Sequence, residues 1–227
     1  MRLPKFTKRY HLKDYKMNLV ILVLALSILG VFVIGSAEPD NQSRQIIGLV
    51  IALTAMVVVS LIDYVWLMDF YWLIYGFVIL ILGAVLIIGT EVNGATRWIN
   101  LGFTNFQPSE LAKILLILFF AKFIAEHEDD INDKKTLLKY AALCAVPLAL
   151  IIAEPNLSTT ICTALVLCLL IYIGGLSYKF IGTVLVILIP TAIIFLAIVV
   201  QPNQPFLQDY QQERILAFLE PEKYADN

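Results

Sequence analysis

Charged side chains are scarce in this sequence, and their signs nearly cancel. Only 15% of the 227 residues are Asp, Glu, Lys or Arg, 60% are hydrophobic, and the formal net charge is −2. Soluble domains carry about 25% charged residues, so this chain has too little polar surface for a soluble globule. A nucleic-acid-binding domain would show a strongly basic face, and the charge balance excludes that class. The composition is that of an integral membrane protein.

Cysteine and histidine are also rare. The cysteines all lie in apolar stretches, where a thiol behaves as a small hydrophobe: Cys144, Cys162 and Cys168. They predict neither a disulfide framework nor a metal site. The charged segment 126–135 is interpreted as a solvated turn, since a metal site using its His127 and the neighbouring acids would have no established ligand spacing.

Long apolar runs dominate what is present. A membrane-spanning helix needs about 20 mostly apolar residues, and it must be helical because lipid offers no partners to backbone groups. The sequence predicts seven spans, at residues 17–37, 45–62, 70–90, 108–125, 136–153, 156–174 and 180–200. We therefore predict an all-α polytopic membrane protein.

The distribution of positive charge predicts the orientation. The arm at residues 1–16 holds six Lys and Arg, and the segment 126–135 adds two lysines, whereas the loops on the other side hold only Arg44 and Arg97. Short loops rich in Lys and Arg stay in the cytoplasm. The N-terminus is thus predicted to be cytoplasmic, and seven spans bring residues 201–227 to the outside.

The most informative segment is the predicted outer loop that follows the third span. Its glycines and asparagines predict turns, so that the loop folds back on the membrane surface. Trp98 in this loop suits the aromatic belt of a membrane interface. Arg97 beside it is suited to bind a phosphate through two hydrogen bonds. Two interpretations of this pair therefore remain open, an interfacial aromatic belt and a phosphate-binding site.

The helix start after this loop carries two ionisable residues. Pro108 suits the first helical position, Glu110 falls in the first turn where the helix dipole favours a carboxylate, and Lys113 lies on the same face three residues later. Ionisable residues in a membrane helix are functional candidates by default. The alternative is a structural ion pair that only keeps two charges satisfied.

A second candidate is the short connection at residues 154–160, which only a tight turn can form. Pro155 suits the first turn of the next helix, and the hydroxyls that follow are suited to satisfy free backbone donors or to meet a ligand. Glu154 lies at the membrane boundary, where a pairing with Arg97 across the outer face is an option. A plain turn is the favoured interpretation.

The last segment predicts an amphipathic surface helix, because apolar residues recur at helical spacing over 215–219 before Pro221 ends it. The chain then stops in a polar sequence with no eighth span. We expect residues 201–227 to be the truncated start of a large extracytoplasmic loop.

Three segments together resemble the shape, elongation, division and sporulation family of FtsW, RodA and SpoVE proteins. They are GATRWINLGFTNFQPSELAK, EPNLSTT and YQQERILAFLEPEKYAD, and they occur in the family's order through nearly the whole chain. The third segment is more similar to the RodA branch. The resemblance implies a ten-span peptidoglycan glycosyltransferase of the bacterial cytoplasmic membrane, which polymerises lipid II at the outer face during cell elongation and shape maintenance.

The resemblance also implies partners and site residues. The partners are lipid II, the growing glycan chain, membrane lipids and a class B penicillin-binding protein. The family's motifs fall here on six substrate-binding candidates: Arg97, Trp98, Glu110, Lys113, Glu154 and Asn156. In the family the last of these positions is an aspartate, so a role that needs a carboxylate there is in doubt.

The family's catalytic base is an aspartate expected beyond residue 227, so the resemblance predicts no catalytic residue within this chain and an inactive fragment. Transfer from a lipid-linked pyrophosphate needs a base and cations that stabilise the departing phosphates. We expect Arg97 to contact phosphate and Glu110 to orient Lys113. A divalent cation bridging the pyrophosphate would suit this chemistry, but no residue specifies one.

Two other functions remain open at this point. A flippase for the same lipid would line its path with Glu110 and Lys113, although the sequence lacks the matching halves that many transporters show. A non-catalytic scaffold would use its spans only to dock a transpeptidase.

Overall fold

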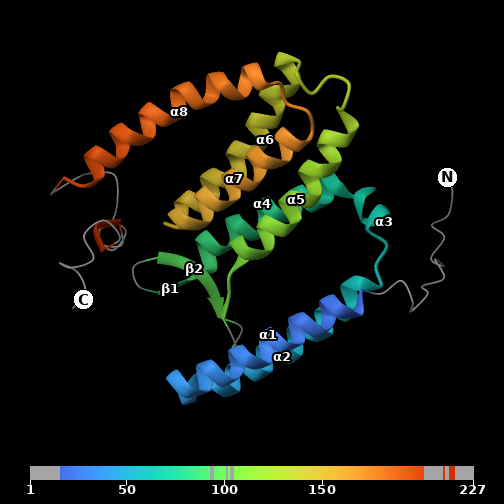
Figure 1. The fold of residues 1–227 in the computed structure, drawn as a ribbon, viewed down its shortest axis with the longest axis vertical. Coiled ribbons are helices and arrows are strands. Elements are labelled where there is room, and N and C mark those ends of the chain that lie inside the picture. The colour runs from blue at the N-terminus through green and yellow to red at the C-terminus, as the bar shows by residue number, and fades with distance from the viewer. Residues whose placement is uncertain are drawn as a thin grey trace. The chain divides into compact units, whose positions relative to one another are not determined.

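The computed structural model describes residues 16–92, 95–100, 102, 105–201, 212 and 215–217. The chain forms two compact units, Met1–Lys122 and Phe123–Asn227, here called the N-terminal unit and the C-terminal unit. Most of the described residues are helical, which confirms the predicted helical class (Figure 1).

The N-terminal unit begins with a helical hairpin of α1 (Met17–Ala37) and α2 (Pro39–Ser60). Only Glu38 separates them, and its backbone (φ −149°, ψ 85°) lies outside the helical region that a following proline disfavours. Pro39 opens α2 at the position where its missing N–H costs nothing. The two helices lie side by side (Figure 1), and their apolar side chains are mostly exposed, as expected for helices that face lipid.

A second helix pair forms the core of this unit. After the short α3 (Tyr64–Met68) come α4 (Tyr71–Ile88) and α5 (Pro108–Glu126). Three rings of α4 surround Phe119 of α5, with centroid distances of 5.5 Å for Tyr71, 5.2 Å for Trp72 and 4.6 Å for Tyr75. The fully buried residues recur every three or four positions, which is one face of each helix: Val78, Leu82, Val85, Ala112, Leu116 and Phe120.

A small antiparallel sheet connects α4 to α5. Its strands are β1 (Thr90–Val92), β2 (Ala95–Asn100) and β3 (Asn105–Phe106), in the order β1-β2-β3. The sequence predicted turns here but no strands, because strands this short contain too few residues to show an alternation of polar and apolar side chains. The predicted turn at Gly102 is present, with a left-handed φ of 88°.

The C-terminal unit contains α6 (Lys134–Ala153), α7 (Leu157–Ile173) and α8 (Tyr178–Val199). The helices α6 and α7 pack against each other (Figure 1), and the buried Tyr140 hydroxyl donates a 2.7 Å hydrogen bond to the Leu167 carbonyl oxygen. Within hydrocarbon such a bond ties two helices together, because a hydroxyl has no water to bond there.

The charged segment 126–135 forms an ordered connection between α5 and α6. The Asp133 carboxylate accepts a hydrogen bond from the Lys135 N–H and so caps α6. The Asn132 side chain reaches the loop before α8, where it donates to the Gly175 carbonyl (3.0 Å) and accepts from the Ser177 N–H (2.7 Å). The predicted exposed turn is therefore a link between two loops.

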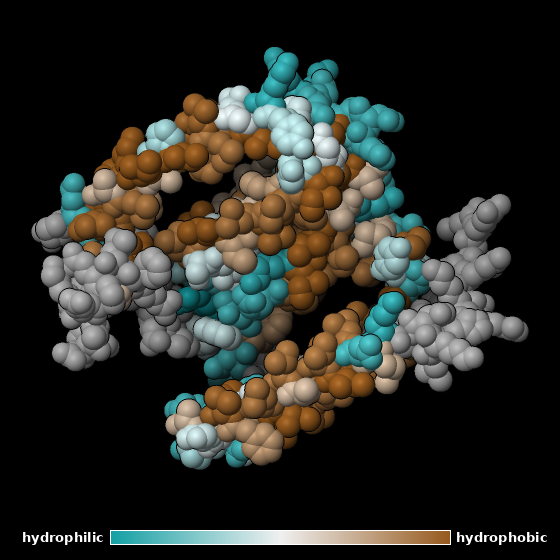
Figure 2. Space-filling model, viewed as in Figure 1, coloured by the Kyte–Doolittle hydropathy of each residue, from teal (hydrophilic) through white to brown (hydrophobic). Residues whose placement is uncertain are grey.

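Each of the seven predicted spans overlaps a helix, with the largest difference at the second, where α2 begins at Pro39 rather than at residue 45. Five of them are long and apolar enough to cross a membrane: α1, α2, α4, α6 and α8. The helix α7 has 17 residues, and α5 carries acidic and basic residues along its 19. Figure 2 shows apolar side chains along the helices and polar ones at their ends. The predicted orientation stays a prediction. Of the predicted surface helix at 215–219, residues 215–217 are helical, and 218–219 lie outside the described residues.

Replacing Asn132 tests the link between the two loops. Asn132→Ala removes both hydrogen bonds, which we expect to lower the local stability of the loop before α8 by about 1–2 kcal/mol. Hydrogen exchange at the Ser177 amide should accelerate accordingly. Asn132→Asp keeps the acceptor for that amide and loses only the donor, so its exchange should be intermediate. Unchanged exchange in Asn132→Ala would contradict the link.

Tyr140→Phe tests the bond between α6 and α7. Interhelical hydrogen bonds of this kind contribute on average about 0.6 kcal/mol in membranes, so the detergent-solubilised variant should unfold at a slightly lower temperature. Tyr64→Phe is the matched control, because that ring is 68% exposed. An equal loss in both variants would show that the bond to Leu167 contributes nothing specific.

Candidate functional site

Arg97 and Trp98 lie on β2, the central strand of the small sheet. In the pairing of β1 with β2, Thr90 is opposite Trp98 while Glu91 is opposite Thr96. Two steps along β2 therefore match one step along β1, and Arg97 is the extra residue of a β-bulge. Bulges bend a strand and redirect a side chain, and they are frequent next to functional sites.

The third strand brings this hairpin to the start of α5. Ile99 pairs with Phe106 and Asn100 with Asn105. The Asn100 side chain also accepts a 2.7 Å hydrogen bond from the Gly102 N–H, which shapes the turn between the strands. Since β3 ends two residues before α5 begins, the bulge and the first turn of α5 belong to one continuous piece of the N-terminal unit.

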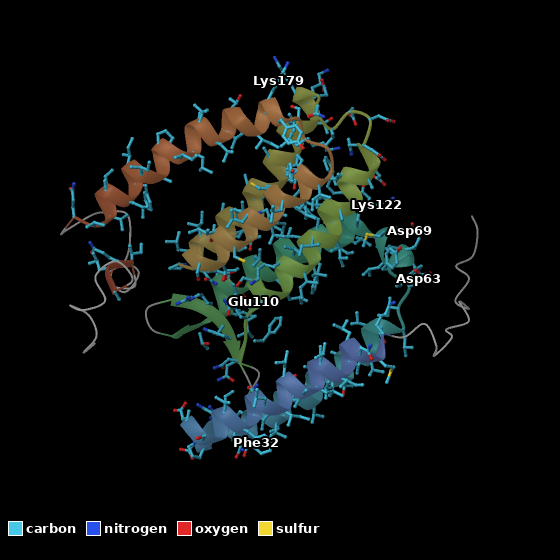
Figure 3. All side chains as sticks on the ribbon, in the orientation of Figure 1. Phe32, Asp63, Asp69, Glu110, Lys122 and Lys179 are labelled. Carbon is cyan, nitrogen blue, oxygen red and sulfur yellow. The ribbon has the colours of Figure 1, made fainter. Side chains whose placement is uncertain are left out.

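The start of α5 holds the two ionisable residues that the sequence analysis singled out. Pro108 is the first helical residue, as predicted. The Lys113 Nζ lies 2.8 Å from the Glu110 Oε1, which confirms that the two side chains share a face. Glu110 is 54% exposed and Lys113 24% exposed. Figure 3 shows Glu110 at the end of α5 that is nearest the strands.

The residue between Pro108 and Glu110 was missed by the sequence analysis. Ser109 is fully buried, and its hydroxyl oxygen accepts a 3.2 Å hydrogen bond from the Gln107 side chain. This bond holds the Gln107 side chain, which lies just before α5, against the first turn of that helix. No sequence signal indicated it, because a serine in a first helical turn is usually exposed.

The turn between α6 and α7 is as tight as predicted, since α6 ends at Ala153 and α7 begins at Leu157. The Thr160 hydroxyl does not satisfy a free backbone donor as expected, whereas the alternative that these hydroxyls meet a ligand stays a prediction. The Asn156 side chain caps α7 by accepting from the Thr159 N–H, while the Thr160 hydroxyl donates to the Asn156 carbonyl oxygen. Ser and Thr hydroxyls within a helix commonly donate to backbone carbonyls of the preceding turn. The N-cap of α7 is already provided by Asn156.

This geometry explains how an asparagine can stand at position 156. Asparagine and aspartate are equally good N-cap residues, since each offers a side-chain oxygen to a backbone N–H. The cap at the start of α7 therefore needs no carboxylate. The neighbouring Glu154 closes α6 and is fully buried.

Of the six predicted site residues, four belong to the N-terminal unit and two to the C-terminal unit. Arg97, Trp98, Glu110 and Lys113 follow one another through β2, β3 and the start of α5. The predicted pairing of Glu154 with Arg97 joins the two units and stays a prediction. Among the described residues, no group of three or more His, Cys, Asp or Glu side chains is arranged to hold a metal ion.

Comparison with known proteins gives consistent matches over most of the chain. The profile of the FtsW/RodA/SpoVE cell cycle proteins matches residues 15–227. The peptidoglycan glycosyltransferase MrdB of Escherichia coli K12 is 32% identical over 211 residues, which are 90% of this chain and 54% of that protein. The probable peptidoglycan glycosyltransferase FtsW of Burkholderia thailandensis is 29% identical over 236 residues, 96% of this chain and 49% of that one.

Solved structures agree with these relatives. A chain of a peptidoglycan synthase complex that coordinates polymerization and crosslinking matches 92% of this chain with a TM-score of 0.72 and 30% identity. The rod shape determining protein RodA of Thermus thermophilus matches 80% with a TM-score of 0.67 and 29% identity. Each match covers 60% of the solved chain.

The chain thus spans about half the length of the curated relatives that it matches. Its helices, five of them long enough to cross a bilayer, agree with a multi-pass protein of the bacterial cytoplasmic membrane. Because the family profile covers nearly all of the sequence and a relative shares 32% identity over 90% of it, the chain belongs to the FtsW/RodA/SpoVE family.

Proposed function

We propose that this protein acts as a peptidoglycan glycosyltransferase that polymerises lipid II during cell elongation and shape maintenance. The observation that carries the proposal is the arrangement of three charged side chains in the N-terminal unit. Arg97 is the bulge residue of β2, and β3 leads from that strand directly to the Glu110–Lys113 pair at the start of α5. The relatives named as peptidoglycan glycosyltransferases support the reaction class.

The proposed topology sets this arrangement at the outer surface. It consists of a cytoplasmic basic arm at 1–16, a bundle of seven spans at 17–200 and an extracytoplasmic segment at 201–227. An arm rich in Lys and Arg stays in the cytoplasm, so the connection between α4 and α5 lies outside. Lipid II presents its pyrophosphate and sugars at that surface.

The proposed roles follow from the chemistry of each group. A guanidinium presents a planar fork of N–H donors that matches phosphate oxygens, so Arg97 holds the pyrophosphate. Lys113 adds a second positive charge where negative charge develops as the phosphate leaves. Trp98, the next residue along β2, provides an apolar ring for the sugar or the lipid.

The Glu110–Lys113 pair is better explained by function than by stability. Exposed ion pairs contribute only about 0–1 kcal/mol, which is a weak reason to place two ionisable residues at the end of a membrane helix. With its carboxylate at 2.8 Å from the lysine, Glu110 orients the ammonium group. We do not assign Glu110 as the base that takes the acceptor hydroxyl proton.

Two further substrate contacts are proposed in the C-terminal unit. The buried Glu154 and Asn156 form the turn between α6 and α7, which the same topology brings to the outer side. Asn156 retains its cap role without a carboxylate, so its contribution to binding would come from its amide. No residue is proposed as a metal ligand, although a divalent cation on the pyrophosphate would be compatible with these roles.

The proposed partners are the growing glycan chain, the surrounding membrane lipids and a class B penicillin-binding protein. The solved synthase complex that coordinates polymerization with crosslinking supports a transpeptidase partner. The exposed apolar helices of both units provide lipid-facing surface.

A reconstitution experiment separates the three candidate functions. The protein produced from its own gene is placed in vesicles with fluorescent lipid II. Long glycan chains support the polymerase, translocation of lipid II without polymer supports a flippase, and neither result supports a scaffold. Either of the last two outcomes would overturn the proposed function.

Alanine substitutions at Arg97 and Glu110 test the site. We expect each to reduce polymerisation about 100-fold or more, the usual loss when a group that stabilises developing charge is removed, with membrane insertion unchanged. Arg44→Ala is the matched control, because that exposed arginine lies on α2, away from the strands and α5 in sequence. Wild-type rates in Arg97→Ala and Glu110→Ala would remove the assignment.

A double substitution separates the roles of Glu110 and Lys113. If Glu110 acts by orienting the lysine, its loss should matter little once Lys113 is gone. Glu110→Ala combined with Lys113→Ala should therefore polymerise lipid II at the rate of Lys113→Ala alone. Multiplicative losses in the double variant would show instead that the two side chains act independently.

A further inference from the structure

We propose that Gly89 and Thr90 are positioning residues, which hold the bulge of β2 on the end of α4 and thereby aim Arg97. This inference rests on the proposed function, in which Arg97 binds the pyrophosphate of lipid II. It assigns a role to the two residues that form the junction between α4 and β1.

The bulge makes the direction of Arg97 depend on its neighbours. In a regular strand, side chains alternate between the two faces and the ladder alone fixes where each one points. A bulge interrupts that alternation and disrupts the ladder locally. The direction of Arg97 therefore depends on how firmly Thr96 and Trp98, the residues on either side of it, are held.

Thr90 holds Trp98, the residue that follows Arg97. Its hydroxyl donates a 3.0 Å hydrogen bond to the Trp98 carbonyl oxygen, across the strand pair at the residue next to the bulge. The bond runs from the first residue of β1 to the main chain of β2. It therefore fixes the backbone of β2 directly after the bulge residue.

Gly89 holds Thr96, the residue that precedes Arg97, through close contact. A Cβ added at Gly89 would lie 2.7 Å from the Thr96 Cγ2 and closer still to the Val85 carbonyl oxygen. The main chain of α4 and the side chain of β2 thus occupy the space that any larger residue would need. Val85 is fully buried, and its carbonyl oxygen accepts a 2.9 Å hydrogen bond from the Gly89 N–H. Moving the end of α4 away from a larger side chain would therefore disturb both this bond and the packing of Val85.

Consecutive residues at one junction therefore contact both sequence neighbours of Arg97. Gly89 sets how closely β2 approaches α4, and Thr90 sets the register at the bulge. Neither residue needs to touch the substrate. Their effect on the reaction passes through the position of Arg97, which distinguishes them from residues that bind phosphate themselves.

The hydroxyl is tested by a pair of substitutions at Thr90. Thr90→Val keeps the shape and removes the donor, whereas Thr90→Ser keeps the donor. For a single neutral hydrogen bond we expect the KM for lipid II to rise about three- to tenfold in Thr90→Val, with Thr90→Ser near the wild-type value. A general loss of folded protein would lower the apparent kcat and leave KM unchanged, so the rise in KM reports positioning.

A spectroscopic measurement reports the hairpin without relying on catalysis. In a background with Trp66→Phe and Trp72→Phe, Trp98 is the one tryptophan left in the sequence. Thr90→Val should increase quenching of its fluorescence by acrylamide, because the strand is held less firmly, and Thr90→Ser should not. Quenching that is unchanged in Thr90→Val, or equally raised in Thr90→Ser, overturns the role of the hydroxyl.

Gly89→Ala tests the contact between the end of α4 and β2, and Gly83→Ala, within α4, is its control. A Cβ at Gly83 would meet nothing within 4 Å. Gly89→Ala should raise both the KM and the Trp98 quenching more than Thr90→Val does, while Gly83→Ala should change neither. Equal effects of the two alanine substitutions overturn the positioning role of Gly89.

The two readouts also separate this inference from the proposed function. If no variant polymerises lipid II but Trp98 quenching follows the expected order, the proposed function fails while Gly89 and Thr90 still position the hairpin. If polymerisation depends on Arg97 but neither KM nor quenching responds to Thr90→Val and Gly89→Ala, the proposed function stands and the positioning role is overturned.

Discussion

The structure depends on one constraint, which is that backbone N–H and C=O groups find no partners in hydrocarbon. Long apolar segments satisfy these groups internally by forming helices, and irregular backbone is confined to the places where helices end. The described chain follows this division, since its three short strands lie between the end of α4 and the start of α5. Polar chemistry is thereby concentrated at helix ends and in the connections between helices.

Those connections are built from a few specific bonds rather than from a large core. The Asn132 side chain bonds to the backbone of Gly175 and Ser177, which lie 43 and 45 residues further along the chain. Asn156 caps α7, and Asp133 caps α6. Each bond is modest in energy, but each lies at the start of a helix. A membrane bundle needs such fixed points, because lipid solvates its apolar faces as well as neighbouring helices do.

The site in the N-terminal unit combines a rigid support with an irregular strand. The support is the buried face that α4 and α5 share, with Phe119 surrounded by three aromatic rings. The irregular strand is β2, whose bulge falls on Arg97. A strongly charged side chain on a firmly supported bulge can be aimed without flexible loops, which favours a preorganised contact with an anionic group.

The amino-acid sequence by itself determined that the protein lies in a membrane, where its seven helical segments fall, and that Glu110 pairs with Lys113. These features follow from the length of apolar runs and from helical spacing, which are local properties. It also predicted the tight turn before α7 and named Arg97 as a candidate for phosphate binding. Only the tertiary structure revealed the sheet between α4 and α5, the bulge, the Thr90 bond and the cap formed by Asn156. The sheet, the bulge and the Thr90 bond depend on which residues meet across a chain reversal, and no local pattern in strands of two to six residues encodes that register. The Asn156 cap is local, but Ser158 and Thr159 beside it also suited a helix cap.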